Sequence, residues 1–75
     1  MNTKEALLNI KLELKRQGKT QRELAKHLGH TDVSISYILS GRNEMKLDMF
    51  LKIAAWLNVA ASDLLKNNQP EAMAA

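Results

Sequence analysis

The sequence predicts an all-α fold of five helices, and three observations carry that prediction. Along most of the 75 residues, apolar side chains recur every three or four positions, which is the period of a helix that buries one face. Each of the first four such stretches is followed by a residue that readily adopts a positive φ, namely Gly18, Gly29, Gly41 or Asn58. No stretch alternates apolar and polar residues in the manner of a β-strand.

The first two helices are separated by a glycine and a capping motif. The first is expected from about Thr3, a suitable N-cap, to Gln17. Its apolar stripe consists of Leu7, Ile10 and Leu14. The second opens at Thr20, whose hydroxyl can bond the backbone of Glu23 while the Glu23 carboxylate bonds back, which is a capping box. Its buried stripe consists of Leu24, Ala25 and Leu28.

Three further helices are expected after Gly29. The third opens at Thr31, with Asp32 in the first turn, where the helix dipole favours a negative charge. Its buried positions are Ile35, Ile38 and Leu39. The fourth is expected over about 47–57. The positions predicted to face inward on it are Leu47, Phe50, Leu51, Ala54 and Leu57. A last short helix contains Leu64 and Leu65, and its start is expected at Ser62 or frayed.

The pattern predicts one small domain over residues 1–67 and a flexible tail over 68–75, where Pro70 interrupts a stretch without an apolar stripe. The chain has no cysteine, so packing must supply its stability without disulfides. Neither a signal peptide nor an apolar run long enough for a bilayer is recognised. A cytoplasmic protein that does not engage a membrane is therefore expected.

Basic residues are concentrated in the first two thirds of the chain. The net charge is +3, and the stretch after Lys46 has no excess of basic over acidic residues. The basic residues before that point include Lys11, Lys15, Arg16, Lys19, Arg22, Lys26, Arg42 and Lys46. Such a local positive field attracts polyanions, nucleic acid above all. A merely solvated charged face would have the same composition, so charge alone does not decide.

The second and third helices together indicate a helix-turn-helix. Each is only about two turns long, and Gly29 can take a positive φ in the tight turn between them. The two apolar stripes then share one core, and the front and outer faces of the third helix keep Asp32, Val33, Ser34, Ser36 and Tyr37. A helix presented in this way fits the major groove of DNA.

Residues Ile10–Leu65 resemble the Cro/repressor-type helix-turn-helix family, the small five-helix DNA-binding domains of phage repressors and many bacterial regulators. The matching pieces are IKLELKRQGKTQ, ELAKHLG, SISYILSGR, LDMFLKIAAWLNV and SDLL, in the family's order and spacing. The resemblance implies a sequence-specific regulator, with repression as the expected outcome, in a bacterial or phage-encoded setting. It implies base-reading positions at Asp32, Val33, Ser36 and Tyr37. It implies DNA-backbone positions at Gln21, Arg22, Ser34, Arg42 and Lys46.

Three positions depart from the family pattern. Lys19 stands where an aliphatic residue is usual, so its ammonium is expected either in water or at a DNA phosphate, and we count it among the backbone positions. His30 replaces a small apolar residue in the turn, and Ala60-Ala61 precede the last helix where Ser or Thr usually caps it. Loose packing is expected at Lys19 and at Ala60.

Several of the predicted readers also have plainer explanations. Tyr37 lies off the buried stripe, so we expect it to be exposed. Val33 suits contact with a thymine methyl, the only methyl that a DNA base presents in the major groove. For Asp32, a helix-capping role competes with acceptance from a cytosine amino group, because phosphates repel a carboxylate. A metal site formed by His27, His30 and Asp32 is not expected, since Gly29 interrupts the helix and no cysteine is present.

Trp56 is either a core residue or an anchor of a homodimer interface that would include Val59 and Ala60. Dimerisation is expected because a short recognition helix reads few base pairs, and a second copy would read another half-site. No cofactor and no small-molecule ligand is expected, and no residue set for catalysis is recognised. The competing hypothesis is a protein-interaction module of the same fold, such as an antitoxin-like or accessory partner with weak DNA binding.

Overall fold

The computed structural model describes residues 3–66, and within them it contains five α-helices and no strand, which confirms the predicted fold class. The helices are α1 (Thr3–Gln17), α2 (Gln21–Leu28), α3 (Asp32–Leu39), α4 (Leu47–Leu57) and α5 (Ala61–Leu64). The predicted tail over 68–75 lies outside the described residues.

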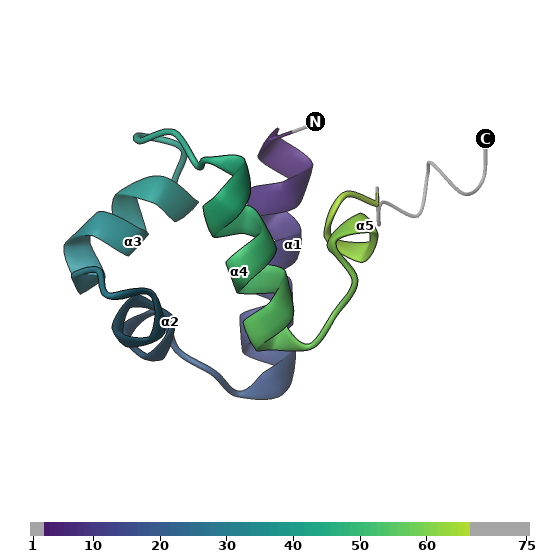
Figure 1. The fold of residues 1–75 in the computed structure, drawn as a ribbon, viewed down its shortest axis with the longest axis horizontal. Coiled ribbons are helices and arrows are strands. Elements are labelled where there is room, and N and C mark those ends of the chain that lie inside the picture. The colour runs from purple at the N-terminus through teal and green to yellow at the C-terminus, as the bar shows by residue number, and fades with distance from the viewer. Residues whose placement is uncertain (1–2, 67–75) are drawn as a thin grey trace.

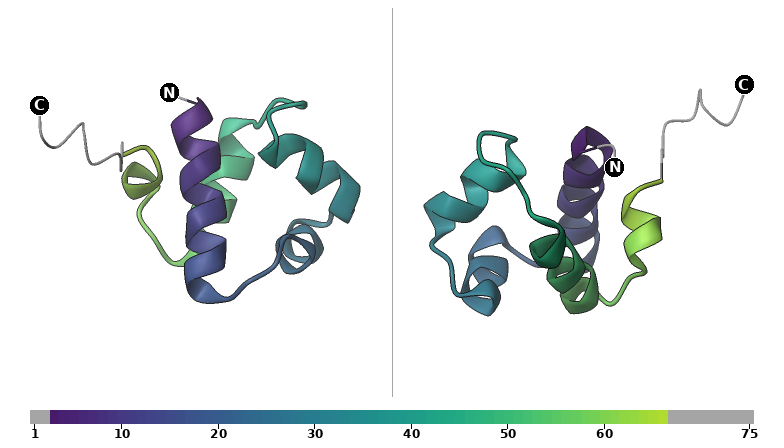
Figure 2. Two further views of the ribbon diagram at one scale, coloured as in Figure 1. Left: turned by 180° about the vertical axis from the view of Figure 1, so that it is seen from behind. Right: turned by 45° about the horizontal axis from the view of Figure 1, so that its top comes forward.

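The helices are arranged around the pair α1 and α4. These two run in the same direction side by side, and α2 and α3 lie on one side of the pair while the short α5 lies on the other (Figures 1 and 2). The C-terminal ends of α1 and α4 meet, because the Gln17 side chain bonds the Leu57 carbonyl. The helix pair α2 and α3 therefore packs against one side of the pair α1 and α4.

The ends of α2 and α3 follow the predicted local chemistry. Thr20 accepts a hydrogen bond from the backbone N–H of Glu23, and the Glu23 carboxylate accepts one from the Thr20 N–H, so the capping box is confirmed. Thr31 caps α3 by accepting from the Ser34 N–H at 3.1 Å. Gly29 ends α2 with a φ of 74°, a value that costs glycine little.

The later helices have weaker N-terminal ends. Neither Lys46 before α4 nor Ala60 before α5 forms a side-chain cap. The fifth helix begins at Ala61, one residue earlier than the Ser62 that the sequence suggested. At the other end of α4, Asn58 adopts the predicted left-handed conformation, with a φ of 59°.

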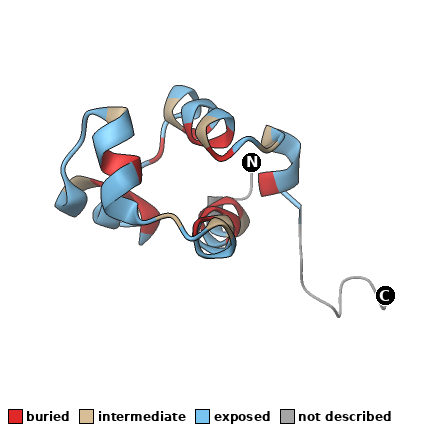
Figure 3. Ribbon diagram, turned by 90° about the horizontal axis from the view of Figure 1, so that it is seen from below, coloured by how far each residue is buried: buried red, intermediate tan, exposed pale blue. Residues whose placement is uncertain are grey.

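One apolar core joins all five helices, and the buried stretches of the ribbons lie on the sides of the helices that face one another (Figure 3). The side chains buried most completely are Ile10, Leu24, Ile35, Leu39, Phe50, Ile53 and Leu57. The inward stripes predicted for α1 and α3 are confirmed, as are Leu24 and Ala25 of α2, while Leu28 is half-buried and packs against the core. A single core of this kind fixes the place of α3 relative to α1 and α4.

The predicted inward face of α4 was wrong at two positions. Leu47 is 63% exposed and Leu51 is 50% exposed, whereas Ile53, which the prediction omitted, is fully buried. The apolar residues of α4 are distributed around most of its circumference. Their spacing therefore did not determine which face of the helix would pack against α1 and α2. Leu65 likewise lies just beyond α5 rather than within it, and it is exposed.

Candidate nucleic-acid interface

The packing of α2 against α3 leaves one side of α3 open to solvent. Ile35 and Ile38 are buried against the core together with Leu24 and Ala25 of α2. In the turn, the His30 N–H bonds the Ala25 carbonyl at 2.9 Å, which holds the chain close to α2 before α3 begins. No helix of residues 3–66 covers the remaining side of α3.

The open side of α3 forms a shallow concavity of about 420 Å³. It is lined by Gln21, Arg22, Asp32, Val33, Ser36 and Tyr37. The fold thus brings all four predicted base-reading residues together with two of the predicted backbone residues. Val33 is 60% exposed and Tyr37 is 40% exposed, which confirms their predicted exposure. Their contacts with bases remain predictions.

An ion pair crosses the concavity between the first turns of α2 and α3. Arg22 Nε donates to Asp32 Oδ2 at 3.0 Å, and the Arg22 side chain is largely in solvent while that of Asp32 is about half exposed. This pair was not predicted from the sequence, because it depends on how the two helices meet. Asp32 therefore has a partner within the domain before any ligand arrives.

The loop after α3 is fastened to the Tyr37 carbonyl. That oxygen accepts from the backbone N–H groups of Arg42 at 2.9 Å and Asn43 at 3.2 Å, and from the Ser40 hydroxyl at 3.0 Å. The Arg42 guanidinium lies 5.0 Å from the centre of the Tyr37 ring. Arg42 is exposed beside Tyr37 of the concavity, where a phosphate could approach it, whereas the exposed Lys46 lines a separate hollow with His30 and Ile38. Ser34 is half-buried, and its hydroxyl lies 3.5 Å from His30 Nδ1.

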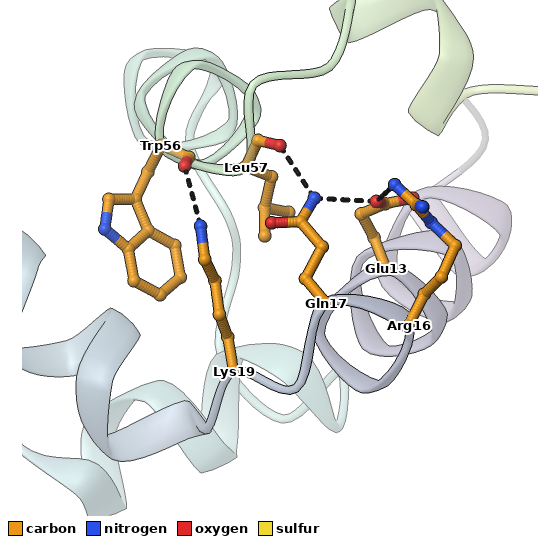
Figure 4. Close-up of polar contacts among 6 residues, drawn as sticks. All are labelled: Glu13, Arg16, Gln17, Lys19, Trp56 and Leu57. Atoms are coloured by element: carbon orange, nitrogen blue, oxygen red, sulfur yellow. Dashed lines mark hydrogen bonds and ion pairs between the residues drawn. The ribbon is translucent and has the colours of Figure 1, made fainter.

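Lys19 points in a direction that the sequence did not suggest. Its Nζ donates to the Trp56 carbonyl at 3.3 Å and lies 4.5 Å from the centre of the Trp56 ring (Figure 4). The ammonium is thus directed at the C-terminal end of α4, rather than at bulk water or at the open side of α3. Its assignment as a phosphate contact remains untested.

The last carbonyls of α4 all have partners. The Ala54 and Ala55 carbonyls accept from the backbone of Asn58, while those of Trp56 and Leu57 accept from the side chains of Lys19 and Gln17. Because a helix end leaves four carbonyls without partners inside the helix, this arrangement satisfies the whole end of α4. A positive ammonium there also complements the helix dipole.

Polar residues of α1 outside the predicted set fasten the end of α4 and the short α5 to α1. Gln17 is itself fixed by Glu13, whose carboxylate also pairs with Arg16 (Figure 4). These bonds lower the pKa of the Glu13 carboxyl, with the Arg16 bond as the largest cause. Asn9 is buried, and its amide donates to the carbonyls of Leu64 and Lys66 at 2.7 Å each, which fastens α5 to α1.

The residues predicted at a dimer interface have different surroundings. Trp56 is half-buried, and its second ring neighbour is His27, stacked at 5.6 Å. Val59 is half-buried and packs against the core, while Ala60 is exposed. Within residues 3–66, no cluster of three acidic or histidine side chains suits a metal ion, and no helix is long and apolar enough to cross a membrane.

The short helix pair, its glycine turn and the exposed front of α3 define a helix-turn-helix DNA-binding domain of the regulatory class. The sequence profile of the Helix-turn-helix family matches residues 10–64, and the chain belongs to this family. The match extends from α1 to the end of α5 and confirms the Cro/repressor-type resemblance. Among curated proteins and solved structures, none gives a significant match.

Proposed function

We propose that the domain is a sequence-specific transcriptional regulator that represses by occupying an operator, with α3 in the major groove. The observation that carries the proposal is the concavity over α2 and α3, which gathers the predicted readers along the exposed side of α3. An exposed Val33 beside polar groups suits a groove that presents both a thymine methyl and hydrogen-bonding base edges.

Charge supports the same orientation. Arg42 lies beside Tyr37 of the concavity, and α4 begins after the exposed Lys46 without a side-chain cap, so its first N–H groups are available to an anion. Basic side chains that neutralise phosphates supply affinity for any DNA sequence, while contacts with base edges supply discrimination. The arrangement provides residues of both kinds.

We further propose that the regulator acts as a homodimer on a partly palindromic site. An eight-residue α3 spans only a few base pairs, so a second copy one helical turn along the DNA would supply the remaining specificity. The interface predicted from sequence involves Trp56, Val59 and Ala60. The exposed Leu47 and Leu51, one turn apart on α4, add an apolar surface that a second copy could cover.

Selection from random duplex DNA at near-physiological salt tests the proposal. Sequencing of the bound fraction should reveal a two-fold symmetric site with half-sites about one turn apart. An enriched site without symmetry would retain the regulator and reject the homodimer. Salt-sensitive binding with no enriched site would reject sequence-specific regulation and favour the protein-interaction module.

A further inference from the structure

We propose that Arg22 reads a guanine in the major groove and that Asp32 positions the Arg22 side chain for this contact. The inference rests on the proposed sequence-specific function and goes beyond it by naming a reader and the base that it reads. These roles differ from those expected from the sequence. From the sequence, Arg22 was assigned to the DNA backbone and Asp32 to a base.

The bond between the two side chains leaves the reading end of Arg22 available. Asp32 Oδ2 accepts from Nε, the guanidinium nitrogen nearest the side-chain stem, at 3.0 Å. Among residues 3–66, the Arg22 guanidinium makes this one hydrogen bond. The Arg22 side chain is 84% exposed. The two terminal amino groups therefore remain as a planar fork of donors. Such a fork matches the O6 and N7 acceptors that guanine presents in the major groove.

Asp32 is suited to positioning and poorly suited to direct reading. It is the first residue of α3, where the helix dipole favours its negative charge. The dipole therefore helps to keep the carboxylate at the N-terminal end of the helix. An unpaired carboxylate would be repelled by the phosphates and by the acceptor groups of most base edges. Paired with Arg22, its charge is neutralised locally. An exposed ion pair contributes little to folding stability, so its main effect is to orient the guanidinium.

The location of Arg22 favours a base over a phosphate. Arg22 and Asp32 line the same concavity as Val33, Ser36 and Tyr37. Arg42 and Lys46, which suit phosphates, lie outside that lining. A guanidinium held across the front of α3 would thus enter the groove with the other readers.

The first experiment compares selected DNA sites for the intact chain and three variants. The intact chain should prefer a G·C pair at one position of each half-site. Arg22→Ala should lose about tenfold discrimination at that pair and keep the other positions. Arg22→Lys keeps the positive charge and lacks the fork, so it should lose the same discrimination while binding random DNA within about twofold of the intact chain. Val33→Ser is the matched control, because it should alter a different base pair.

A double-mutant cycle tests the positioning role of Asp32. Asp32→Asn keeps the side-chain shape and removes the charge, so it should reduce the guanine preference in the intact chain. In the Arg22→Ala background, the same change should have no effect on that preference. Circular dichroism melts should show each variant folded, as expected for exposed positions.

Four outcomes would overturn the inference, and the last of them would also overturn the proposed function. An Asp32→Asn effect that persists without Arg22 would make Asp32 a direct reader. Uniform weakening by Arg22→Ala with an unchanged preferred site would make Arg22 a phosphate contact. An enriched site without a guanine dependent on Arg22 would reject this reader and leave the proposed function standing. Absence of any enriched site for the intact chain would instead reject the proposed function itself, together with the inference.

Discussion

Two pairs of a cation and an aromatic ring lie on different sides of this domain, and their surroundings differ sharply. Lys19 Nζ lies 4.5 Å from the Trp56 ring, and the Arg42 guanidinium lies 5.0 Å from the Tyr37 ring. Lys19 is half-buried and bonds the end of α4, whereas Arg42 is exposed beside the open side of α3. From sequence, both cations were assigned to the DNA backbone.

The different surroundings of the two aromatic rings predict different roles for the two cations. Trp56 packs against the core and is stacked on His27, so a cation over its ring is drawn toward the interior. Tyr37 stands on the exposed front of α3, so a cation over its ring stays where a ligand can reach it. We therefore expect the first pair to affect stability and the second to affect DNA binding.

The largest expected effect is that of Trp56→Ala. The change removes the ring contacts with Lys19 and His27 and leaves a gap at the edge of the core, which should lower the free energy of unfolding by about 2 kcal/mol. Urea denaturation followed by circular dichroism measures the loss. Tyr37→Ala, at the more exposed ring, is the control and should cost less than about 1 kcal/mol. Equal losses would remove the contrast between the two pairs.

Arg42→Ala should act on binding and leave folding almost unchanged. Loss of one phosphate contact should weaken binding to every duplex sequence by roughly 1 kcal/mol and reduce the slope of log K against log salt by about 1. Fluorescence anisotropy over a salt series measures both quantities. Unchanged affinity and slope would remove Arg42 from the interface.

Lys19→Met should have the reverse profile. The variant keeps an unbranched side chain of similar length and loses the hydrogen bond and charge at the end of α4, so the free energy of unfolding should fall by about 1 kcal/mol. The salt slope of DNA binding should stay the same. A slope reduced as much as in Arg42→Ala would show that Lys19 turns to a phosphate in the complex.

The smallest expected effect concerns acid. Arg16 and Gln17 lower the pKa of the Glu13 carboxyl in the folded state, so Glu13 stabilises the fold fully only above the ordinary pKa of an unfolded Glu carboxyl. That stabilisation should be lost as the pH falls from there through the lower folded pKa. Glu13→Gln should therefore flatten the acid limb of a stability–pH curve. An unchanged acid limb would show that other carboxylates determine it.

Local chemistry made much of the fold predictable. The capping box at Thr20, the cap at Thr31 and the left-handed Gly29 and Asn58 each involve residues within a few positions, and all are confirmed. The buried face of α4 was partly mispredicted. When apolar residues lie around most of a helix, contacts with the neighbouring helices determine which face is buried. Leu47 and Leu51 are exposed for that reason.

Contacts between distant residues account for what the sequence did not predict at the site. Arg22 and Asp32 are 10 positions apart, Lys19 and Trp56 are 37 apart, and Asn9 and Leu64 are 55 apart. No periodicity or cap relates such residues, and a charged side chain of this length can point in several directions. The composition indicated a basic surface suited to DNA. Only the packing of the helices determines which cations lie on that surface.

The capped end of α4 has a consequence for the linker between α1 and α2. Gln17 and Lys19 flank Gly18 and bond two adjacent carbonyls, those of Leu57 and Trp56. An extra residue inserted beside Gly18 would separate these donors and break at least one bond, so the linker has a fixed length. It acts as a spacer that determines where α2 begins relative to α4. An insertion in these few residues should accordingly lower the free energy of unfolding.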